Sequence, residues 1–293
     1  MLSRDQKTTI AETLRTYIKR FKSQNQAVNS LKGISAGTVS QMLNGKWENI
    51  SEDMWLKLQA QIAQPSGWKI CQTHAFMDVM TFLSFAKKES SVVWVTGPAG
   101  IGKTTAARIF ANDRKNVFIL PCSEDMHKAD FVKELAAKIG VNTNGLTVRE
   151  TLQAIIKQLV TLDSPLLVFD EGDKLTDSVL YYYISLYNAL EDKCGMVFLS
   201  TAYMEKRVRA GIEKGKKGYD ELESRISRRF VPLSSVNAAE IEAICRANGL
   251  EDDAAIRRVQ HDASGHGNDL RRVKESVKAQ RNKIATQAAA VQA

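Results

Sequence analysis

The sequence lacks the features that mark membrane and secreted proteins. None of its 293 residues belongs to an apolar run approaching the ~20 residues that a helix needs to span a bilayer. The N-terminal stretch MLSRDQKTTIAETLR also lacks the apolar segment of a secretory signal peptide. We therefore expect a cytoplasmic protein with no membrane partner.

Cysteine and histidine are scarce, and neither shows the spacing of a metal site. The sequence has four of each, and the cysteines lie far apart, at Cys71, Cys122, Cys194 and Cys245. In a cytoplasmic chain such cysteines are reduced and mostly buried. We expect no disulfide and no zinc site.

Positive charge is in excess and is unevenly distributed. The formal net charge is +8 at pH 7, and the pI is about 9.2. Residues 1–64 contain nine Lys/Arg against five Asp/Glu, and residues 203–230 have the same balance. Excess positive charge attracts polyanions, of which nucleic acid is the usual one inside a cell. The clustering favours specific basic surfaces over a diffuse excess.

The pattern of apolar residues changes along the chain. Residues 1–63 suggest short helices, and the turn-forming residues at 64–67 suggest a linker. From residue 90 onward, apolar runs alternate with amphipathic helical stretches, and the runs cover 92–96, 117–121, 166–170, 196–200 and 230–233. Continuous apolar runs suit strands buried on both faces of a parallel sheet. We therefore predict a doubly wound α/β core. Three helical stretches follow it, at 238–248, 252–261 and 268–284.

A phosphate-binding motif follows the first of these strands. Residues 97–104 have the pattern G-x-x-x-x-G-K-T, with a strand before it and a helix after it. In such a loop, main-chain N–H groups and the helix N-terminus surround phosphate oxygens. Lys103 would reach the β- and γ-phosphates, and the Thr104 hydroxyl would bind Mg²⁺. The predicted ATP-binding residues are Gly97, Pro98, Ala99, Gly100, Ile101, Gly102, Lys103, Thr104 and Thr105.

A pair of acids ends the third strand. The sequence PLLVFDE places Asp170 and Glu171 directly after four apolar residues. Beside a phosphate loop, Asp170 would hold Mg²⁺, and Glu171 would orient or deprotonate the attacking water. The two motifs together predict an ATPase.

The motifs resemble those of AAA+ ATPases over about residues 72–284. The resemblance implies a five-stranded parallel core, a C-terminal helical lid, and assembly into rings or helical filaments with ATP between neighbours. It divides the chain into a helical module at 1–64, an ATPase core at 65–236, and a lid with C-terminal tail at 237–293.

Three further segments resemble AAA+ elements that contact nucleotide. A polar residue after the fourth strand contacts the γ-phosphate and the attacking water in that family; Thr201 or Ser200 fits, although Asn is commoner there. The segment before the last strand resembles the arginine-finger region, with Arg225 as the first choice and Arg228 and Arg229 as alternatives. Arg271 matches the arginine of the sensor-2 motif, which touches the nucleotide.

The N-terminal module has a two-helix layout. A first helix should end near Leu31, Gly33 should make the turn, and Ser35 should cap a second helix. Val39 and Leu43 should be buried together on that helix, because residues four apart share one face.

This layout resembles the helix-turn-helix of phage repressors. The resemblance implies that the second helix lies in the major groove, where Thr38 and Gln41 reach base edges and Lys46 reaches a phosphate. A small helical bundle for protein contact is the alternative, but the local net charge of +4 favours DNA.

The combination of a repressor-like module with a compact AAA+ domain resembles the Mu B-like transposition regulators, which are related to the TnsC and IstB group. That resemblance covers nearly the whole chain. It implies an ATP-bound polymer on duplex DNA with little sequence preference, delivery of this DNA to a transposase, and disassembly driven by ATP hydrolysis. Two alternatives are a helicase loader or replication initiator, and a transcription regulator in which ATP switches the helix-turn-helix.

DNA-associated polymers of this kind would bind backbone phosphates, so their affinity should fall steeply with salt. The candidate contacts in the ATPase core are Lys128, Lys214, Lys216 and Lys217.

Overall fold

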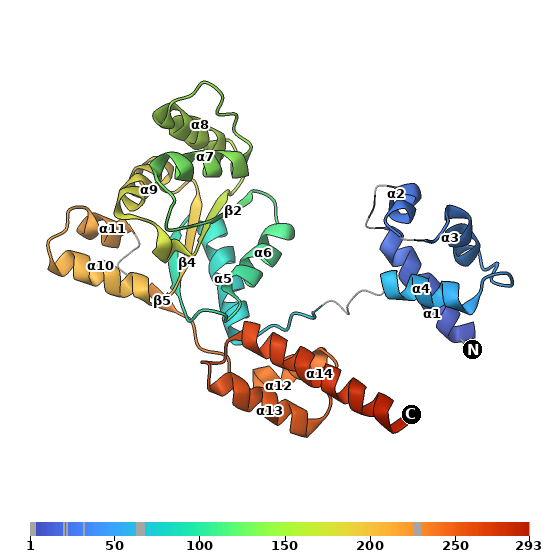
Figure 1. Ribbon diagram of the computed structural model, residues 1–293. Helices are drawn as coiled ribbons and strands as arrows, with labels where there is room; N and C mark the ends of the chain where they lie inside the picture. The colour runs from blue at the N-terminus through green and yellow to red at the C-terminus, as the bar shows by residue number, and fades with distance from the viewer. Residues whose placement is uncertain are drawn as a thin grey trace. The chain divides into compact units, whose positions relative to one another are not determined.

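The computed structural model describes residues 4–19, 21, 23–31, 33–62, 68–225 and 230–292 (Figure 1). The chain forms two units, Met1–Lys69 and Ile70–Ala293. The predicted linker at 64–67 lies outside the described residues. Within the described part of the chain, no helix combines the length and apolar character needed to cross a membrane.

The described residues of the N-terminal unit form helices only. These are α1 (Arg4–Ile18), α2 (Gln24–Asn29), α3 (Ala36–Leu43) and α4 (Glu52–Ile62). Their apolar faces meet around the fully buried side chains of Leu14, Met42, Trp55 and Leu58. The unit therefore has its own hydrophobic core.

The α2–α3 connection has the local features that the sequence predicts. Gly33 has a φ of +70°, and the Ser35 hydroxyl accepts a hydrogen bond from the Thr38 N–H at 3.1 Å. Val39 and Met42 are fully buried in the core of the unit, and Leu43 is partly buried and packs against the same core. The expected burial of Val39 with Leu43 is therefore confirmed in part, and Met42 is the buried side chain that the sequence pattern missed. Whether α2 and α3 act as a DNA-binding helix-turn-helix stays a prediction.

The larger unit is built on a five-stranded parallel sheet with the order β2-β3-β4-β1-β5. The strands are β1 (Val92–Thr96), β2 (Val117–Pro121), β3 (Leu166–Asp170), β4 (Gly195–Ser200) and β5 (Phe230–Pro232). The predicted α/β class and all five strands are confirmed, with bounds that differ by at most one residue. Because the strands are parallel, the residues that follow β1, β3 and β4 lie at one edge of the sheet.

Helices cover both faces of this sheet. On one side, α5 (His74–Glu89) packs against β1, β3 and β4, and α6 (Lys103–Asn112) packs against α5 and β2. The other helices of the core are α7 (Lys128–Ile139), α8 (Val148–Val160), α9 (Asp177–Leu190), α10 (Tyr203–Glu213) and α11 (Tyr219–Arg225). They form one buried cluster with alternate side chains of the strands. This is the arrangement expected of strands buried on both faces.

An aromatic stack lies in the buried cluster between the sheet and helices α7–α11. The rings of Trp94 and Phe198 stack with centroids 4.1 Å apart, and Phe169 stacks on Phe198 at 4.6 Å. The Tyr183 ring meets Phe198 edge-on at 4.7 Å. These contacts fix the relative positions of β1, β3 and β4, whose ends carry the predicted site.

Three helices follow the core, in the segment that is predicted to be the lid: α12 (Ala238–Ala247), α13 (Asp253–Ser264) and α14 (Leu270–Gln292). The Asn237 side chain caps α12, and Glu240 completes the capping box. Glu240 also accepts a hydrogen bond from the His74 N–H at 2.6 Å, which joins the lid to the start of α5. The lid is therefore attached to the helix that covers the sheet.

Candidate nucleotide-binding site

The phosphate loop connects β1 to α6 at the carboxyl edge of the sheet. Gly100 and Gly102 have φ angles of +75° and +99°, in the left-handed region that favours glycine. Such a backbone turns successive N–H groups toward the concave side of the loop, where an anion can bind. Residues 97–104 therefore have the conformation that their sequence predicts for a phosphate site.

Lys103 lies at the first position of α6 and bends back over the loop. Its Nζ donates hydrogen bonds to the carbonyls of Gly97 at 2.7 Å and Pro98 at 2.8 Å. Burial lowers the pKa of Lys103, while the nearby carboxylates of Asp173 and Asp170 oppose that shift. The ammonium group is thus held at the mouth of the loop, between main-chain carbonyls and acids.

Asp170 ends β3 and is only 5% exposed. Burial raises the pKa of its carboxyl, and a hydrogen bond with the Thr104 side chain works in the opposite direction. The two groups assigned to Mg²⁺ from the sequence are therefore neighbours in the structure. A hydroxyl and a carboxylate are oxygen ligands of the kind Mg²⁺ takes, so this pair fits the ion.

Glu171, the next residue, has a strained left-handed backbone with a φ of +57°. Its side chain is about half exposed and forms an ion pair with Lys174, one helical turn later. The two acids therefore have different environments. Asp170 is buried at the strand end, and after the strained turn Glu171 lies on the surface of the site.

The two hydroxyls after β4 have different environments. Ser200 is 1% exposed, and its Oγ accepts a hydrogen bond from the buried Trp94 indole at 2.7 Å. Thr201 is partly exposed, and its Oγ1 donates to an Asp173 carboxylate oxygen at 2.7 Å. The Ser200 hydroxyl is therefore part of the core, and Thr201 is the better candidate for the residue that contacts the reacting groups.

Sequence reasoning did not identify Asp173 or Arg207 as part of the site. Asp173 lies in the 3-10 turn η1 (Gly172–Lys174), and Arg207 of α10 donates to the carbonyls of Asp173 and Leu175 at 3.3 and 2.6 Å. The DEGD sequence was a local signal for Asp173, because a third acid after the pair lies on the same turn. Arg207 had no such signal.

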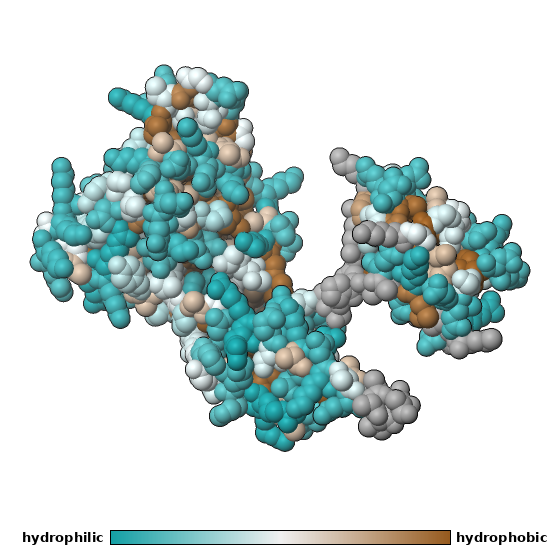
Figure 2. All heavy atoms as spheres, viewed as in Figure 1, coloured by the Kyte–Doolittle hydropathy of each residue, from teal (hydrophilic) through white to brown (hydrophobic). Residues whose placement is uncertain are grey.

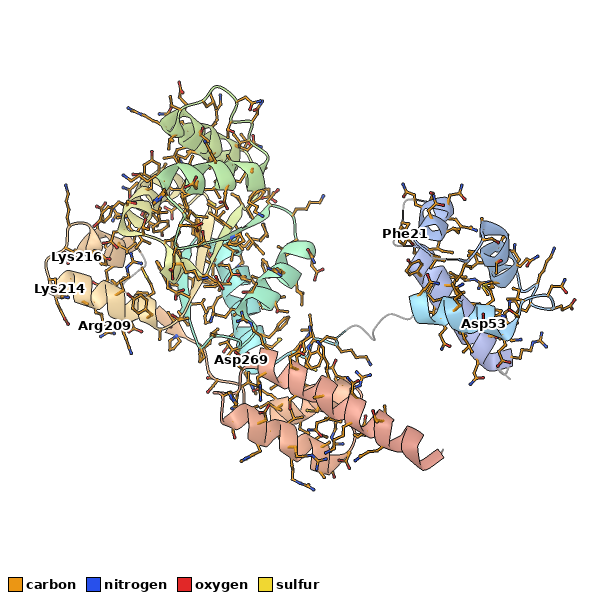
Figure 3. The ribbon with its side chains drawn as sticks, viewed as in Figure 1. Phe21, Asp53, Arg209, Lys214, Lys216 and Asp269 are labelled. Atoms are coloured by element: carbon orange, nitrogen blue, oxygen red, sulfur yellow. The ribbon has the colours of Figure 1, made fainter. Side chains whose placement is uncertain are left out.

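The lid contacts the phosphate loop directly. The Leu270 N–H donates to the Gly100 carbonyl at 3.0 Å, and the Asp269 carboxylate lies against Gly100. Figure 3 shows Asp269 at the start of α14, where the lid meets the core. The positive charge of Arg271 lies near enough to Lys103 to lower its pKa further. Arg271 thus lies near the phosphate loop, where it is predicted to contact the nucleotide.

Arg225 lies away from this edge of the sheet, at the end of α11. Its Nε donates to the Asn188 side chain of α9 at 2.8 Å, and its guanidinium lies 5.5 Å from the Tyr187 ring centroid. Arg228 and Arg229 fall outside the described residues. A role for any of the three as an arginine finger stays a prediction.

The candidate DNA contacts are surface residues in both units. In the N-terminal unit Gln41 and Lys46 are exposed, whereas the Thr38 hydroxyl is hydrogen-bonded to that of Ser35 at 2.9 Å. In the larger unit all four candidate lysines are exposed: Lys128, Lys214, Lys216 and Lys217. The last three lie around the α10–α11 turn, in a region of Figure 2 whose surface is predominantly hydrophilic.

Comparison with known proteins relates the chain to one group. Residues 86–208 match the family described as an AAA domain. The "Mu-like prophage FluMu DNA transposition protein B" of Haemophilus influenzae is 24% identical over 82% of this chain and 85% of its own length. The "ATP-dependent target DNA activator B" of Escherichia phage Mu is also 24% identical, over 87% of this chain and 82% of its own length.

Solved structures give more distant matches. A Walker-type ATPase of Pyrococcus abyssi is 12% identical, with a TM-score of 0.47 over 73% of this chain and 74% of that one. A RuvB variant of Thermotoga maritima is 18% identical, with a TM-score of 0.38 over 69% of each chain. The sequence matches are the informative ones: residues 86–208 match an AAA domain, and most of the chain is similar to the Mu-type transposition B proteins.

Proposed function

We propose that this protein is an ATP-dependent transposition regulator that assembles on duplex DNA and presents that DNA to a transposase. The observation that supports it most is the geometry of the phosphate loop in a chain whose relatives include proteins named target DNA activators. The site combines a phosphate loop, an acid pair and a lid that contacts the loop.

ATP binding follows from the loop and the lid. Main-chain N–H groups of residues 97–104 and the N-terminus of α6 surround the β- and γ-phosphates. Lys103 exchanges its carbonyl partners for phosphate oxygens, which attract its charge more strongly than neutral carbonyls do. Arg271 adds a second positive charge from the lid. Because the lid touches Gly100, nucleotide binding and lid position are coupled.

Hydrolysis requires a metal ion and an activated water. Thr104 and Asp170 are the residues that would hold Mg²⁺, which neutralises charge on the phosphate oxygens when it is bound. Glu171 orients the attacking water and accepts its proton. Its partly exposed ion pair with Lys174 is worth at most about 1 kcal/mol, so the carboxylate can exchange that partner for the water at little cost.

DNA binding rests on positive charge. Lys214, Lys216 and Lys217 project from the α10–α11 turn, and Lys128 begins α7. Flexible exposed lysines suit phosphate contacts, which position a protein on DNA without reading its sequence. Self-association brings the lysines of many subunits to one duplex, so the salt dependence of the polymer should be steep.

Electron microscopy with random-sequence duplex DNA tests the proposal. The wild-type chain should form filaments or rings on DNA with ATP or a non-hydrolysable analogue, and should form none without nucleotide. Lys103→Ala should abolish both nucleotide retention and assembly. Lys138→Ala, which changes an exposed lysine on α7, is the matched control and should assemble normally.

Two outcomes would oppose the proposal. A wild-type chain that retains no adenine nucleotide with magnesium would remove its basis. Binding to one preferred operator without any polymer would instead support an ATP-switched transcription regulator.

A further inference from the structure

The Thr201 hydroxyl makes two hydrogen bonds, one as a donor and one as an acceptor. Its Oγ1 donates its proton to the Asp173 carboxylate at 2.7 Å. The same oxygen accepts a hydrogen bond from the Tyr203 N–H at 3.3 Å, at the start of α10. A hydroxyl has one proton and two acceptor positions, so these contacts leave it one acceptor position and no free proton.

Asp173 links this hydroxyl to the acids near the phosphate loop. It follows Glu171 by two residues, and its carboxylate is among those that oppose the lowering of the Lys103 pKa by burial. A single acid therefore faces the lysine that binds phosphate and also fixes the residue predicted to contact the reacting groups.

Arg207 holds the backbone that carries Asp173. Its guanidinium donates to the carbonyls of Asp173 and Leu175, and it forms an ion pair with Asp177. The Arg207 side chain is only 17% exposed, and Tyr219 provides a further contact at 3.2 Å. The planar guanidinium binds several acceptors at fixed angles, so the segment from Asp173 to Asp177 is tied to α10.

The direction of the hydrogen bond restricts what Thr201 can do. Oxygens of a fully ionised terminal phosphate are acceptors, so a hydroxyl binds them only by donating its proton. The Thr201 hydroxyl already uses that proton in its hydrogen bond to Asp173. A water molecule, in contrast, can donate to the acceptor position that remains on Oγ1.

We infer that Asp173 is a positioning residue: it holds the Thr201 hydroxyl so that Oγ1 accepts a hydrogen bond from the attacking water and does not bind the terminal phosphate. Thr201 then helps to orient the water that Glu171 activates. This inference rests on the proposed ATPase function and assigns roles within the same site. It predicts an effect on turnover that is separate from nucleotide affinity.

Steady-state hydrolysis and nucleotide binding of two single variants and their double variant test it. Thr201→Val and Asp173→Ala should each lower kcat on the order of 10- to 100-fold, the cost of a misplaced reacting group. The ratio of affinities for a non-hydrolysable ATP analogue and for ADP should stay within about twofold of the wild-type value, since no phosphate contact is lost. The double variant should be no slower than the slower single variant.

Conservative replacements separate the hydrogen bond from the charge. Asp173→Asn keeps an acceptor oxygen and should recover much of the turnover lost in Asp173→Ala. Thr201→Ser should be close to the wild type. Asp220→Ala, at an exposed acid on α11, is the control and should leave kcat unchanged.

Three results would overturn the inference. They are a selective loss of affinity for the ATP analogue in Thr201→Val, equal rates for the Asn and Ala variants of Asp173, and multiplying effects in the double variant. A wild-type chain that binds ATP but never hydrolyses it would refute the proposed ATPase itself. That failure is distinct from a hydrolysing wild type whose Asp173 variants are unaffected.

Discussion

Gly100 and Asp269 lie so close that a side chain at position 100 would force the Asp269 carboxylate to move. A Cβ built on Gly100 would fall 1.9 Å from a carboxylate oxygen of Asp269, and the φ of +75° at Gly100 already disfavours other residues. We expect Gly100→Ala to push the start of α14 away from the phosphate loop. Because Arg271 would move with it, ATP affinity should fall at least tenfold, an effect of about 1.4 kcal/mol. Titration with a fluorescent ATP analogue measures this.

Gly145 provides a control for backbone strain. Its φ is +74°, and nothing lies within 4 Å of the Cβ position. Gly145→Ala should therefore destabilise the fold by a similar strain but leave ATP affinity unchanged. Adding Asp269→Ala to Gly100→Ala should restore part of the affinity, since it removes the clash. Equal affinities for Gly100→Ala and the wild type would show that the lid contact is irrelevant to nucleotide binding.

Glu171→Gln tests the proposed base. Glutamine has the same shape but cannot accept a proton, so ATP binding should persist while turnover falls by about 100-fold or more. The polymer on DNA should then persist, because hydrolysis drives its disassembly. Phosphate release and filament lifetime on DNA are the two measurements. Normal hydrolysis by this variant would mean that another group activates the water.

Much of the site could be predicted because it depends on residues that are close together in the sequence. An apolar strand, a glycine loop and a helix follow one another around Lys103, and another apolar strand ends at Asp170. Parallel strands then bring these ends to one edge of the sheet. No contact from a distant segment is needed to place either residue.

The remaining assignments depend on contacts between distant segments. Ser200 and Thr201 look alike in sequence, and only the Trp94 indole from β1 decides which of them belongs to the core. The importance of Asp173 likewise emerges from the later residues that bind it, Thr201 and Arg207. Sequence spacing alone carries no information about such partners.

Glu240 gives a prediction for pH dependence. Burial tends to raise its pKa, but hydrogen bonds from Asn237 and His74 outweigh this and hold the pKa below its ordinary value. A lowered pKa means that the ionised form stabilises the fold above the ordinary glutamate pKa of about 4.3, and that this contribution is lost as the pH falls through the folded-state pKa. Glu240→Ala should cost about 1 kcal/mol at pH 7, as loss of a helix cap does.

Urea unfolding at several pH values measures this effect. The difference between wild type and Glu240→Ala should shrink as the pH falls below about 4, where the native carboxylate gains its proton. The His74 ring, 2.8 Å from the Glu240 carboxylate, is the titratable group that faces it. Glu213→Ala, at an exposed site on α10, should be neutral throughout. A difference that stays constant with pH would argue against a role for the charge.

Arg207→Lys keeps a positive charge but loses the planar fork that binds Asp173, Leu175, Asp177 and Tyr219. A lysine ammonium cannot reproduce these angles, so carbonyl and carboxylate groups would lose their partners. We expect a loss of about 2 kcal/mol in unfolding free energy, the usual cost of removing hydrogen bonds to a charged group. Turnover should fall as well, because the segment that carries Asp173 would loosen.

Arg209→Lys, whose ion pair with Glu205 is exposed on the same helix, should change stability by less than about 0.5 kcal/mol. Equal behaviour of the two variants in urea unfolding and in ATP hydrolysis would refute a positioning role for Arg207.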